Sequence, residues 1–388
     1  MLIFNEQQKA DTVVADSLKS NAKWGSRDRH FIAENTYEII RWWRLLKFCA
    51  EVNERKFTDE ANFWKLAGAW LSLKEYELPD WPEWTSISPE KILSKKEEAE
   101  NIRKIRESIP DWLDEKGEAE VPDWDREMHA MNEEASVFLR VNESRISVQD
   151  LLQQFEKDEI EAEPVPGLKN ALRLLKRKNL SAYSGFRKGY FEIQDAGSQL
   201  IAEFVRPKPG EQILDACAGA GGKSLYMAEL MENSGTILAT DVHHRKLEEL
   251  EKRAQRNYIK IIRAQKVKQL NETELAGWAD KVLLDVPCSG SGVLKRNPDA
   301  KWKLQPEFLE NIKKTQSDIL DQYSRILKPG GKMVYATCSI LPSENQQQVE
   351  KFLAREEGKD FKLVKDQKVL SSESGYDGFY MALLEKAK

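Results

Sequence analysis

The second half of the chain alternates short apolar segments with amphipathic ones, and this alternation constrains the fold more than any other feature of the sequence. The apolar runs read QILDA, TILATD, KVLLDV and KMVYAT, and stretches with apolar residues three or four positions apart follow the first two. Apolar strands that alternate with amphipathic helices predict a parallel, doubly wound sheet with helices on both faces. Because such sheets bind ligands at the carboxyl ends of their strands, we expect functional residues directly after the strands.

The first part of the chain lacks this alternation and predicts an all-helical domain. Three of its segments carry apolar residues at three- and four-residue spacing: 11–20, 27–52 and 57–73. Trp24-Gly25-Ser26 separates the first two. Prolines then divide an acidic stretch into short helices, two of which are expected to begin at Pro110-Asp111 and Pro122-Asp123.

A third region lies between these two. The run SVFLRVN predicts a strand, and VQDLLQQFEKD predicts a helix that Ser147 caps. The run GLKNALRLLKRKN is interpreted as a basic helix. The expected division is a helical domain over 1–134, a small α/β connector with this basic helix over 135–190, and the doubly wound domain over 191–388.

Composition excludes several classes of protein. The chain has 388 residues, of which 40% are hydrophobic and 32% charged, which is typical of a globular protein. No apolar run approaches the ~18–20 residues of a membrane helix, so no membrane partner is expected. A secretory signal is not expected either, and the expected location is the cytoplasm. With four histidines, and four cysteines without a CxxC pair, neither a metal site nor a disulfide framework is expected.

Charge is distributed unevenly along the chain. The net charge is −5, which argues mildly against a nucleic-acid partner. However, residues 164–191 contain seven Lys or Arg and no acid, whereas residues 97–134 contain fourteen Asp or Glu against five Lys or Arg. A basic stretch of this kind can follow a phosphate backbone, although a solvated helix face is the alternative. The candidate RNA-binding residues here are Arg173, Lys176, Arg177 and Arg187.

The first strand of the doubly wound domain ends in a turn of small residues. The sequence DACAGAGGK matches neither a P-loop nor a dinucleotide-binding GxGxxG motif. Small residues let backbone approach a ligand closely, although a simple tight turn is the alternative. Asp241 ends the next strand, where a carboxylate can bind ribose hydroxyls or cap a helix. Together they indicate a nucleoside-bearing cofactor, and S-adenosylmethionine is favoured over NAD. The candidate cofactor residues in the turn are Cys217, Ala218, Gly219, Ala220, Gly221, Gly222 and Lys223.

Two cysteines follow the next two strands. Cys288 lies in DVPCSGSG and Cys338 lies in TCS, so the two thiols are expected at neighbouring strand ends over one site. A disulfide between them is an alternative that a reducing cytosol disfavours. For Cys49 and Cys217, the favoured interpretation is a small buried hydrophobe.

Taken together, these motifs resemble those of the RsmB-like (Nop/Sun) RNA cytosine-5 methyltransferases, over nearly the whole chain. The resemblance also rests on Gln194-Asp195-Ala196, Arg296-Asn297-Pro298-Asp299, Lys301-Trp302, Glu344-Asn345 and Asp377-Gly378-Phe379-Tyr380. It implies a Rossmann-like class I methyltransferase domain that binds S-adenosylmethionine. In the N-terminal part, WGSRDRHFIAENTYEIIR is similar to the NusB-like RNA-binding domain of that family.

The resemblance also assigns roles to individual residues. It implies that the Cys338 thiolate adds to cytosine C6, which makes C5 nucleophilic, and that Cys288 removes the C5 proton so that the adduct can break. Asp285 is expected to supply or stabilise a proton at N3 and to lie at the cofactor, while Lys223 supports the thiolate or the cofactor carboxylate. Because the base must be unstacked, a single-stranded or flipped RNA nucleotide is the expected substrate. Arg296 is a further candidate for RNA contact.

The sequence departs from the family pattern in two places. Gly219-Ala220 replaces the usual Ala-Pro of the turn and keeps the residues small. The acid that normally follows the third strand and binds the adenine amino group is absent, and Gln265 is the candidate to replace it through its side-chain carbonyl.

These observations favour an RNA cytosine-5 methyltransferase that acts on ribosomal RNA as a monomer. The alternatives are a methyltransferase for transfer RNA and a non-catalytic RNA-binding factor for ribosome assembly. Intact Cys288, Cys338, Asp285 and Lys223 argue against the non-catalytic alternative. An amino-methylating enzyme is disfavoured because DVPC stands where such enzymes carry Asp/Asn-Pro-Pro-aromatic.

Overall fold

The computed structural model describes residues 2–52, 59–269 and 273–388. The chain separates into two compact units, which are described one at a time below. The first contains residues 1–133 together with 294–306, and the second contains residues 134–293 and 307–388. The three-part division expected from the sequence stays a prediction. None of the helices in the described ranges is long and apolar enough to cross a membrane.

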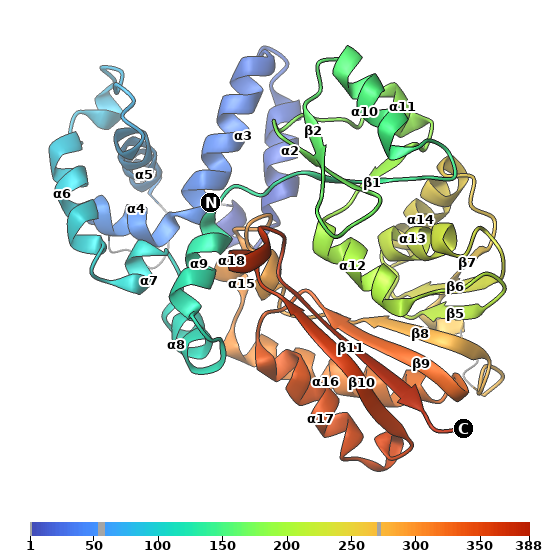
Figure 1. Cartoon of the computed structure of the whole chain (residues 1–388). Coiled ribbons are helices and arrows are strands. Elements are labelled where there is room, and N and C mark those ends of the chain that lie inside the picture. Colours follow the sequence, from blue (N-terminus) through green and yellow to red (C-terminus); the bar gives the residue numbers. More distant parts are fainter. Residues whose placement is uncertain (1, 53–58, 270–272) are drawn as a thin grey trace. The chain divides into compact units, whose positions relative to one another are not determined.

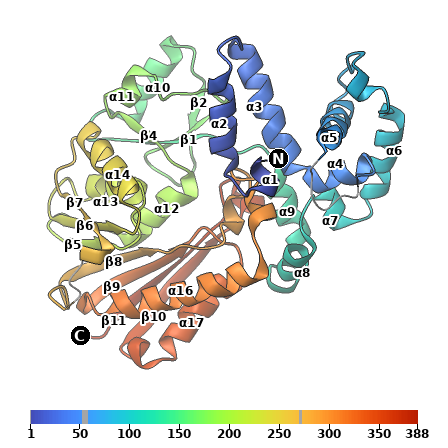
Figure 2. The same cartoon turned by 180° about the vertical axis from the view of Figure 1, so that it is seen from behind.

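The first unit is all-helical in its described part, as the sequence predicts (Figures 1 and 2). Its elements are α1 (Leu2–Asn5), α2 (Ala10–Ser20), α3 (Ser26–Arg41), α4 (Trp43–Cys49), α5 (Glu60–Leu73), η1 (Pro82–Trp84), α6 (Pro89–Ala99), α7 (Arg103–Arg106), α8 (Asp111–Glu120), α9 (Trp124–Asn132) and α15 (Ala300–Lys303). The expected helix starts at Pro110 and Asp123 are confirmed, because these residues immediately precede α8 and α9. Residues 57 and 58 of the third predicted segment lie outside the described ranges.

The predicted single helix over 27–52 is wrong in one respect, because the structure divides it at Trp42 into α3 and α4. The division lets two runs of apolar side chains enter different clusters. Ile40 packs with Ile3 and Ala10, whereas Trp43 and its successors pack with α5 and α6. A straight helix keeps a fixed angular spacing between residues, so it would not present both sets to their partners.

The second unit begins with a small antiparallel sheet whose strand order is β2-β3-β1-β4. The strands are β1 (Phe138–Val141), β2 (Ala162–Pro164), β3 (Ala171–Leu174) and β4 (Phe191–Ile193), and the helices are α10 (Val148–Lys157) and α11 (Ser184–Arg187). The predictions for SVFLRVN and for VQDLLQQFEKD are confirmed, and the Ser147 hydroxyl accepts a hydrogen bond from the backbone N–H of Asp150, as expected for a cap.

The predicted basic helix over 167–179 is wrong, because its centre is strand β3. Leu172 and Leu174 are buried while Arg173 between them is exposed, which is the two-residue period of a strand. The helical interpretation also required Leu175 to face the core, but this side chain is 50% exposed. Arg173 instead lies opposite Glu163 of β2, in register with it.

The larger sheet of the second unit confirms the doubly wound prediction. It has seven strands in the order β10-β11-β9-β8-β5-β6-β7. The five strands from β9 to β7 are parallel, and β11 and β10 are antiparallel additions at one edge. The strands are β5 (Gln212–Asp215), β6 (Thr236–Asp241), β7 (Ile262–Lys266), β8 (Ala279–Asp285), β9 (Leu327–Thr337), β10 (Phe361–Val369) and β11 (Phe379–Lys386).

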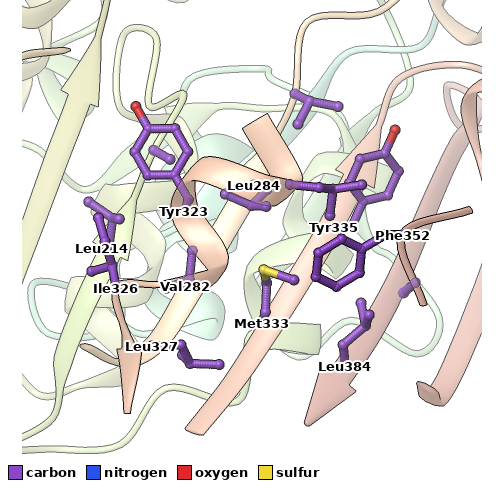
Figure 3. Close-up of a cluster of buried hydrophobic side chains, with 14 of the residues drawn as sticks. Leu214, Val282, Leu284, Tyr323, Ile326, Leu327, Met333, Tyr335, Phe352 and Leu384 are labelled. Carbon is purple, nitrogen blue, oxygen red and sulfur yellow. The ribbon is translucent and has the colours of Figure 1, made fainter. Parts of the chain in front are cut away.

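Helices cover both faces of this sheet (Figure 1). One face packs against α12 (Ala196–Val205) and α13 (Gly222–Leu230), and α14 (His244–Arg256) lies beside β6 and β7. The other face packs against α16 (Pro306–Ser324) and α17 (Gln346–Leu353). Figure 3 shows this second cluster, in which Tyr323 of α16 and Phe352 of α17 lie over Val282 and Met333 of the central strands. Remaining short elements are η2 (Val267–Gln269), η3 (Ser291–Val293), η4 (Pro342–Glu344), η5 (Glu356–Gly358) and α18 (Ser371–Ser374).

A buried carboxylate joins the small sheet of the second unit to helix α14. Glu192 of β4 is 1% exposed and accepts hydrogen bonds from Arg253, Arg256 and Asn257 at the end of α14. Burial alone would raise the pKa of Glu192, but the two guanidinium groups and the Asn257 amide outweigh it, so the pKa lies below its ordinary value. The charge of Glu192 therefore stabilises the folded state.

This ion-pair cluster predicts a pH-dependent contribution to stability. A carboxyl group with a lowered folded pKa contributes fully above its unfolded pKa of about 4.3 and loses that contribution as pH falls through the folded value. We expect Glu192→Gln to lower the free energy of unfolding by about 3 kcal/mol at pH 7, and by progressively less below about pH 4. Urea denaturation across this pH range, with the exposed Glu249→Gln as control, measures the effect. A difference between wild type and Glu192→Gln that does not vary with pH would contradict the assignment.

Candidate active site

The turn after β5 is built for close backbone approach. Gly219 and Gly221 have φ angles of 57° and 82°, which favour glycine, and a Cβ on Gly221 would lie 2.5 Å from Leu250 Cγ. Two arginines hold the carbonyl groups of the turn: Arg253 donates to Ala220 O at 2.8 Å and Arg140 donates to Gly222 O at 2.8 Å. Space next to Gly219 is open, since no atom of the described residues, apart from Gly219 and its two chain neighbours, lies within 4 Å of the position of a Cβ there.

Asp241 lies beside this turn, at the end of β6. Its Oδ2 accepts a hydrogen bond from Gly219 N at 3.0 Å, and its Oδ1 accepts one from His243 N at 2.7 Å. A carboxylate has about four lone-pair sites, so each oxygen can still accept a hydrogen bond from a ligand hydroxyl. The structure therefore places Asp241 where the sequence predicts it, against the glycine turn.

A second carboxylate lies beneath the turn, and the candidate residues from the sequence did not include it. Asp215 is 1% exposed; its Oδ2 accepts a hydrogen bond from the Ser224 hydroxyl at 2.6 Å, and its Oδ1 has no partner among the described residues. Burial, with Asp285 and Asp241 adding to it and the Ser224 hydrogen bond opposing it, raises the pKa of Asp215 to about 7. A bound cation would favour its ionised form. Its position directly before the turn is the signal that could have identified it.

Lys223 and Asp285 form an ion pair at the ends of α13 and β8. Nζ of Lys223 donates to Asp285 Oδ2 at 2.6 Å. Burial would lower the pKa of Lys223, but the attraction of Asp285 and their hydrogen bond outweigh it, so this pKa is raised. The pair therefore brings a cation and an acid together at the site.

The two cysteines of the neighbouring strand ends meet. Cys288 Sγ and Cys338 Sγ are 3.1 Å apart, and both thiols are free. The hydrogen bond with Cys338 raises the pKa of Cys288, and burial raises it further. Cys288 is thus favoured in its thiol form, and either sulfur atom can be the donor in the contact between them.

Backbone contacts fix the loops that carry the cysteines. Gly292 N donates to Cys338 O at 2.9 Å, and Gly378 N donates to Gly292 O at 2.6 Å. A Cβ on Gly292 would lie 2.1 Å from Gly378 O and 2.9 Å from Cys338 O. Only glycine at position 292 lets these three segments approach so closely, which explains the second Gly of SGSG.

A carboxylate for which no role was expected binds both cysteine loops. Glu344 of η4 accepts hydrogen bonds from Ser289, which follows Cys288, and from Ser339, which follows Cys338. Asn345 accepts from the Thr337 hydroxyl and donates to Ser339 O at 2.9 Å. The signal in the sequence was the Glu-Asn pair that follows TCS.

The candidate RNA-binding residues are not brought together as one basic helix face. Three of them pair with acids of nearby segments, namely Arg173 with Glu163, Lys176 with Glu161 and Arg177 with Glu134. Arg187 of α11 is exposed. Arg296 belongs to the segment 294–306, which clusters with the first unit.

Two candidate cofactor residues remain. Cys217 follows the end of β5 and is partly buried; burial and three neighbouring carboxylates raise its pKa, with Lys246 opposing them. Gln265 of β7 lies opposite Thr240 and lines a pocket of about 500 Å³ together with Leu238, Arg263 and Trp278. The contact of Gln265 with an adenine amino group stays a prediction.

Comparison with known proteins identifies similar families and relatives. The family described as 16S rRNA methyltransferase RsmB/F matches residues 202–385, and the ferredoxin-like domain of RsmF/B-like methyltransferases matches residues 109–181. Ribosomal RNA small subunit methyltransferase B of Photorhabdus laumondii is 35% identical over 290 residues, which cover 71% of this chain and 66% of that protein. The chain thus spans slightly less than two thirds of the length of that relative.

Two solved structures have a similar fold. The crystal structure of PH0851 covers 96% of this chain and 93% of its own, with a TM-score of 0.81 and 24% identity. A methyltransferase homolog protein from Pyrococcus horikoshii covers 73% of this chain and 97% of its own, with a TM-score of 0.65 and 26% identity.

The crowded glycine between the cysteine loops generates a prediction. We expect Gly292→Ala to separate the loops and to lower the free energy of unfolding by about 1–3 kcal/mol, because two backbone carbonyls occupy the space of the new methyl group. Thermal unfolding measures the change. Gly25→Ala is the control, since its Cβ would lie 3.6 Å from the nearest side-chain atom. Equal melting temperatures for the two variants would contradict the close approach.

Proposed function

The chain belongs to the RsmB/F methyltransferase family, and on this premise we propose that it methylates C5 of a cytosine in ribosomal RNA. The observation that carries the proposal is the pair of free thiols, Cys288 and Cys338, with sulfur atoms 3.1 Å apart beside the Lys223–Asp285 pair. Methylation of an unactivated C5 needs one thiol to add to C6 and one group to remove the C5 proton. Two free thiols in contact with each other are suited to that division.

S-adenosylmethionine fits the residues of the site. The molecule carries a sulfonium and an ammonium cation together with ribose hydroxyls. Carboxylates end three adjacent strands here, namely Asp215, Asp241 and Asp285, and one oxygen of Asp215 is buried without a partner among the described residues. When bound, S-adenosylmethionine supplies the methyl group. We propose that Asp241 holds the ribose and that residues 217–222 lie along the cofactor.

The remaining chemistry is proposed for residues of this chain. Cys338 adds to C6 as a thiolate, while Asp285, which is hydrogen-bonded to Lys223, supplies or stabilises the proton at N3. After methylation, Cys288 first loses its own proton to solvent and then, as a thiolate, takes the C5 proton. The electron pair of the C5–H bond forms the C5–C6 double bond, and Cys338 leaves C6 as a thiolate. Because C6 is shielded within a base stack, the target cytosine must be unstacked or flipped.

RNA contacts are proposed for Arg173, Lys176, Arg177, Arg187 and Arg296. The first three are exposed and paired with exposed or half-exposed acids, and such surface ion pairs contribute only about 0–1 kcal/mol. They can therefore exchange a carboxylate for a phosphate at little energetic cost. That the protein acts as a monomer in the cytoplasm also stays a prediction.

Bisulfite sequencing tests the substrate. Ribosomal and transfer RNA from cells with and without the gene are compared, and we expect one protected cytosine in ribosomal RNA to become reactive when the gene is absent. Complementation with the gene should restore its protection. A change confined to transfer RNA would favour the transfer RNA alternative, and no change in either RNA would favour the non-catalytic assembly factor.

The proposed roles of the two cysteines predict that their alanine variants fail at different steps of the reaction. Cys338→Ala should form neither a covalent complex nor product, because the nucleophile is lost. Cys288→Ala should still attack and methylate but not release, so it should accumulate a protein–RNA adduct that survives denaturing gels. The double variant, which should show no adduct, is the control. Trapping by Cys338→Ala instead of Cys288→Ala would reverse the assignment.

A further inference from the structure

Glu344 is a fully buried carboxylate between the two cysteine loops. Its side chain is 0% exposed, and four neutral donors point at it. Oε1 accepts from Ser289 N at 2.8 Å and from Gln316 Nε2 at 3.0 Å. Oε2 accepts from the hydroxyl groups of Ser289, at 2.5 Å, and Ser339, at 2.6 Å. Burying a carboxylate is expensive unless hydrogen bonds satisfy it, so this arrangement is a specific one.

The partners of Glu344 are the residues next to the cysteines. Ser289 follows Cys288 and Ser339 follows Cys338, and one oxygen atom accepts both hydroxyl protons. This carboxylate therefore ties the two loops together through their side chains, in addition to the backbone contact between Gly292 and Cys338. The positions of the two sulfur atoms follow from the positions of these loops.

The hydrogens of the surrounding network have one consistent assignment. Because the Ser339 hydroxyl donates to Glu344, the 2.9 Å contact between Ser291 Oγ and Ser339 Oγ has Ser291 as its donor. Ser291 Oγ in turn accepts from Ile340 N at 3.1 Å. The chain of hydrogen bonds from Ile340 N through Ser291 and Ser339 therefore ends on Glu344, whose carboxylate only accepts. An amide in place of the carboxylate would add two N–H donors at a point where four donors already converge.

We propose that Glu344 is a positioning residue that sets the spacing of the Cys288 and Cys338 sulfur atoms for their successive steps on one cytosine. The inference rests on the proposed function, in which Cys338 acts at C6 and Cys288 at the adjacent C5. Two thiols that act on neighbouring ring atoms must keep a short and constant distance between their sulfur atoms. The negative charge of Glu344 also adds to the causes that raise the pKa of Cys288, after the hydrogen bond with Cys338 and burial.

Kinetics provide the first test. Glu344→Gln keeps the shape of the side chain but replaces an acceptor with a donor, and we expect kcat to fall about ten- to a hundredfold with an unchanged KM for RNA. Glu344→Asp keeps the charge but shortens the reach, and it should fail to restore kcat. The exposed Glu350→Gln on α17 is the matched control. An unchanged kcat for Glu344→Gln would overturn the proposal.

Disulfide formation provides a readout that does not depend on activity. Diamide joins two nearby thiols: its azo group takes both protons and both electrons and becomes a hydrazine, and the two sulfur atoms bond. Peptide mapping by mass spectrometry measures how fast the Cys288–Cys338 bridge forms. We expect rapid bridging in wild type and in Glu350→Gln, and bridging about tenfold slower or more in Glu344→Gln, because loss of the carboxylate lets the loops separate.

The combined outcomes separate this inference from the proposed function. Slower bridging in Glu344→Gln, with a wild-type protein that does not methylate RNA, would support the positioning role and contradict the function. Equal bridging rates in a folded variant would contradict the positioning role. Should Glu344→Gln fail to fold, Ser339→Ala removes one of the four hydrogen bonds, and we expect a smaller slowing in the same direction; an unchanged bridging rate in that variant would overturn the proposal.

Discussion

The parallel pairing of β8 with β9 is the constraint on which the candidate site depends. Asp285 lies opposite Ala336 in this pairing, so the loops that follow the two strands leave the sheet side by side. Cys288 and Cys338 are 50 residues apart in sequence, yet this register brings their sulfur atoms to 3.1 Å. A shift of one residue would turn every side chain of the strand to the other face of the sheet.

Several buried ionisable side chains lie around this pair of cysteines, although burying such groups in a protein core is energetically costly. Asp215, Glu344 and the Lys223–Asp285 pair lie at the carboxyl ends of β5, β8 and β9. Each has a specific arrangement of donors or counter-charges, but one oxygen of Asp215 lacks a partner among the described residues. Strain and unpaired polar groups gather where a ligand can relieve them, and a cationic cofactor would do so at this point.

The two secondary-structure predictions that were wrong have the same physical cause. Both the segment over 167–179 and the segment over 27–52 were interpreted from local sequence alone. In the first, residues such as Leu172 and Leu175 fit a helical period, but pairing of β3 with β1 and β2 decides in favour of a strand. In the second, Ile40 and Trp43 pack in two separate hydrophobic clusters, and the helix is divided between them. Tertiary partners are not visible in local spacing, and they outweigh local propensity.

The sequence by itself determined the class of the larger domain and the identity of its chemical groups. Alternating apolar and amphipathic runs specify a doubly wound sheet, and residues at strand ends such as Cys288, Cys338 and Asp241 are short-range features of those runs. Tertiary structure alone decided the spacing of the two sulfur atoms and the role of Glu344, since these depend on hydrogen bonds between segments far apart in the chain. It also decided that Arg173 faces Glu163, because only strand register brings these two charges together.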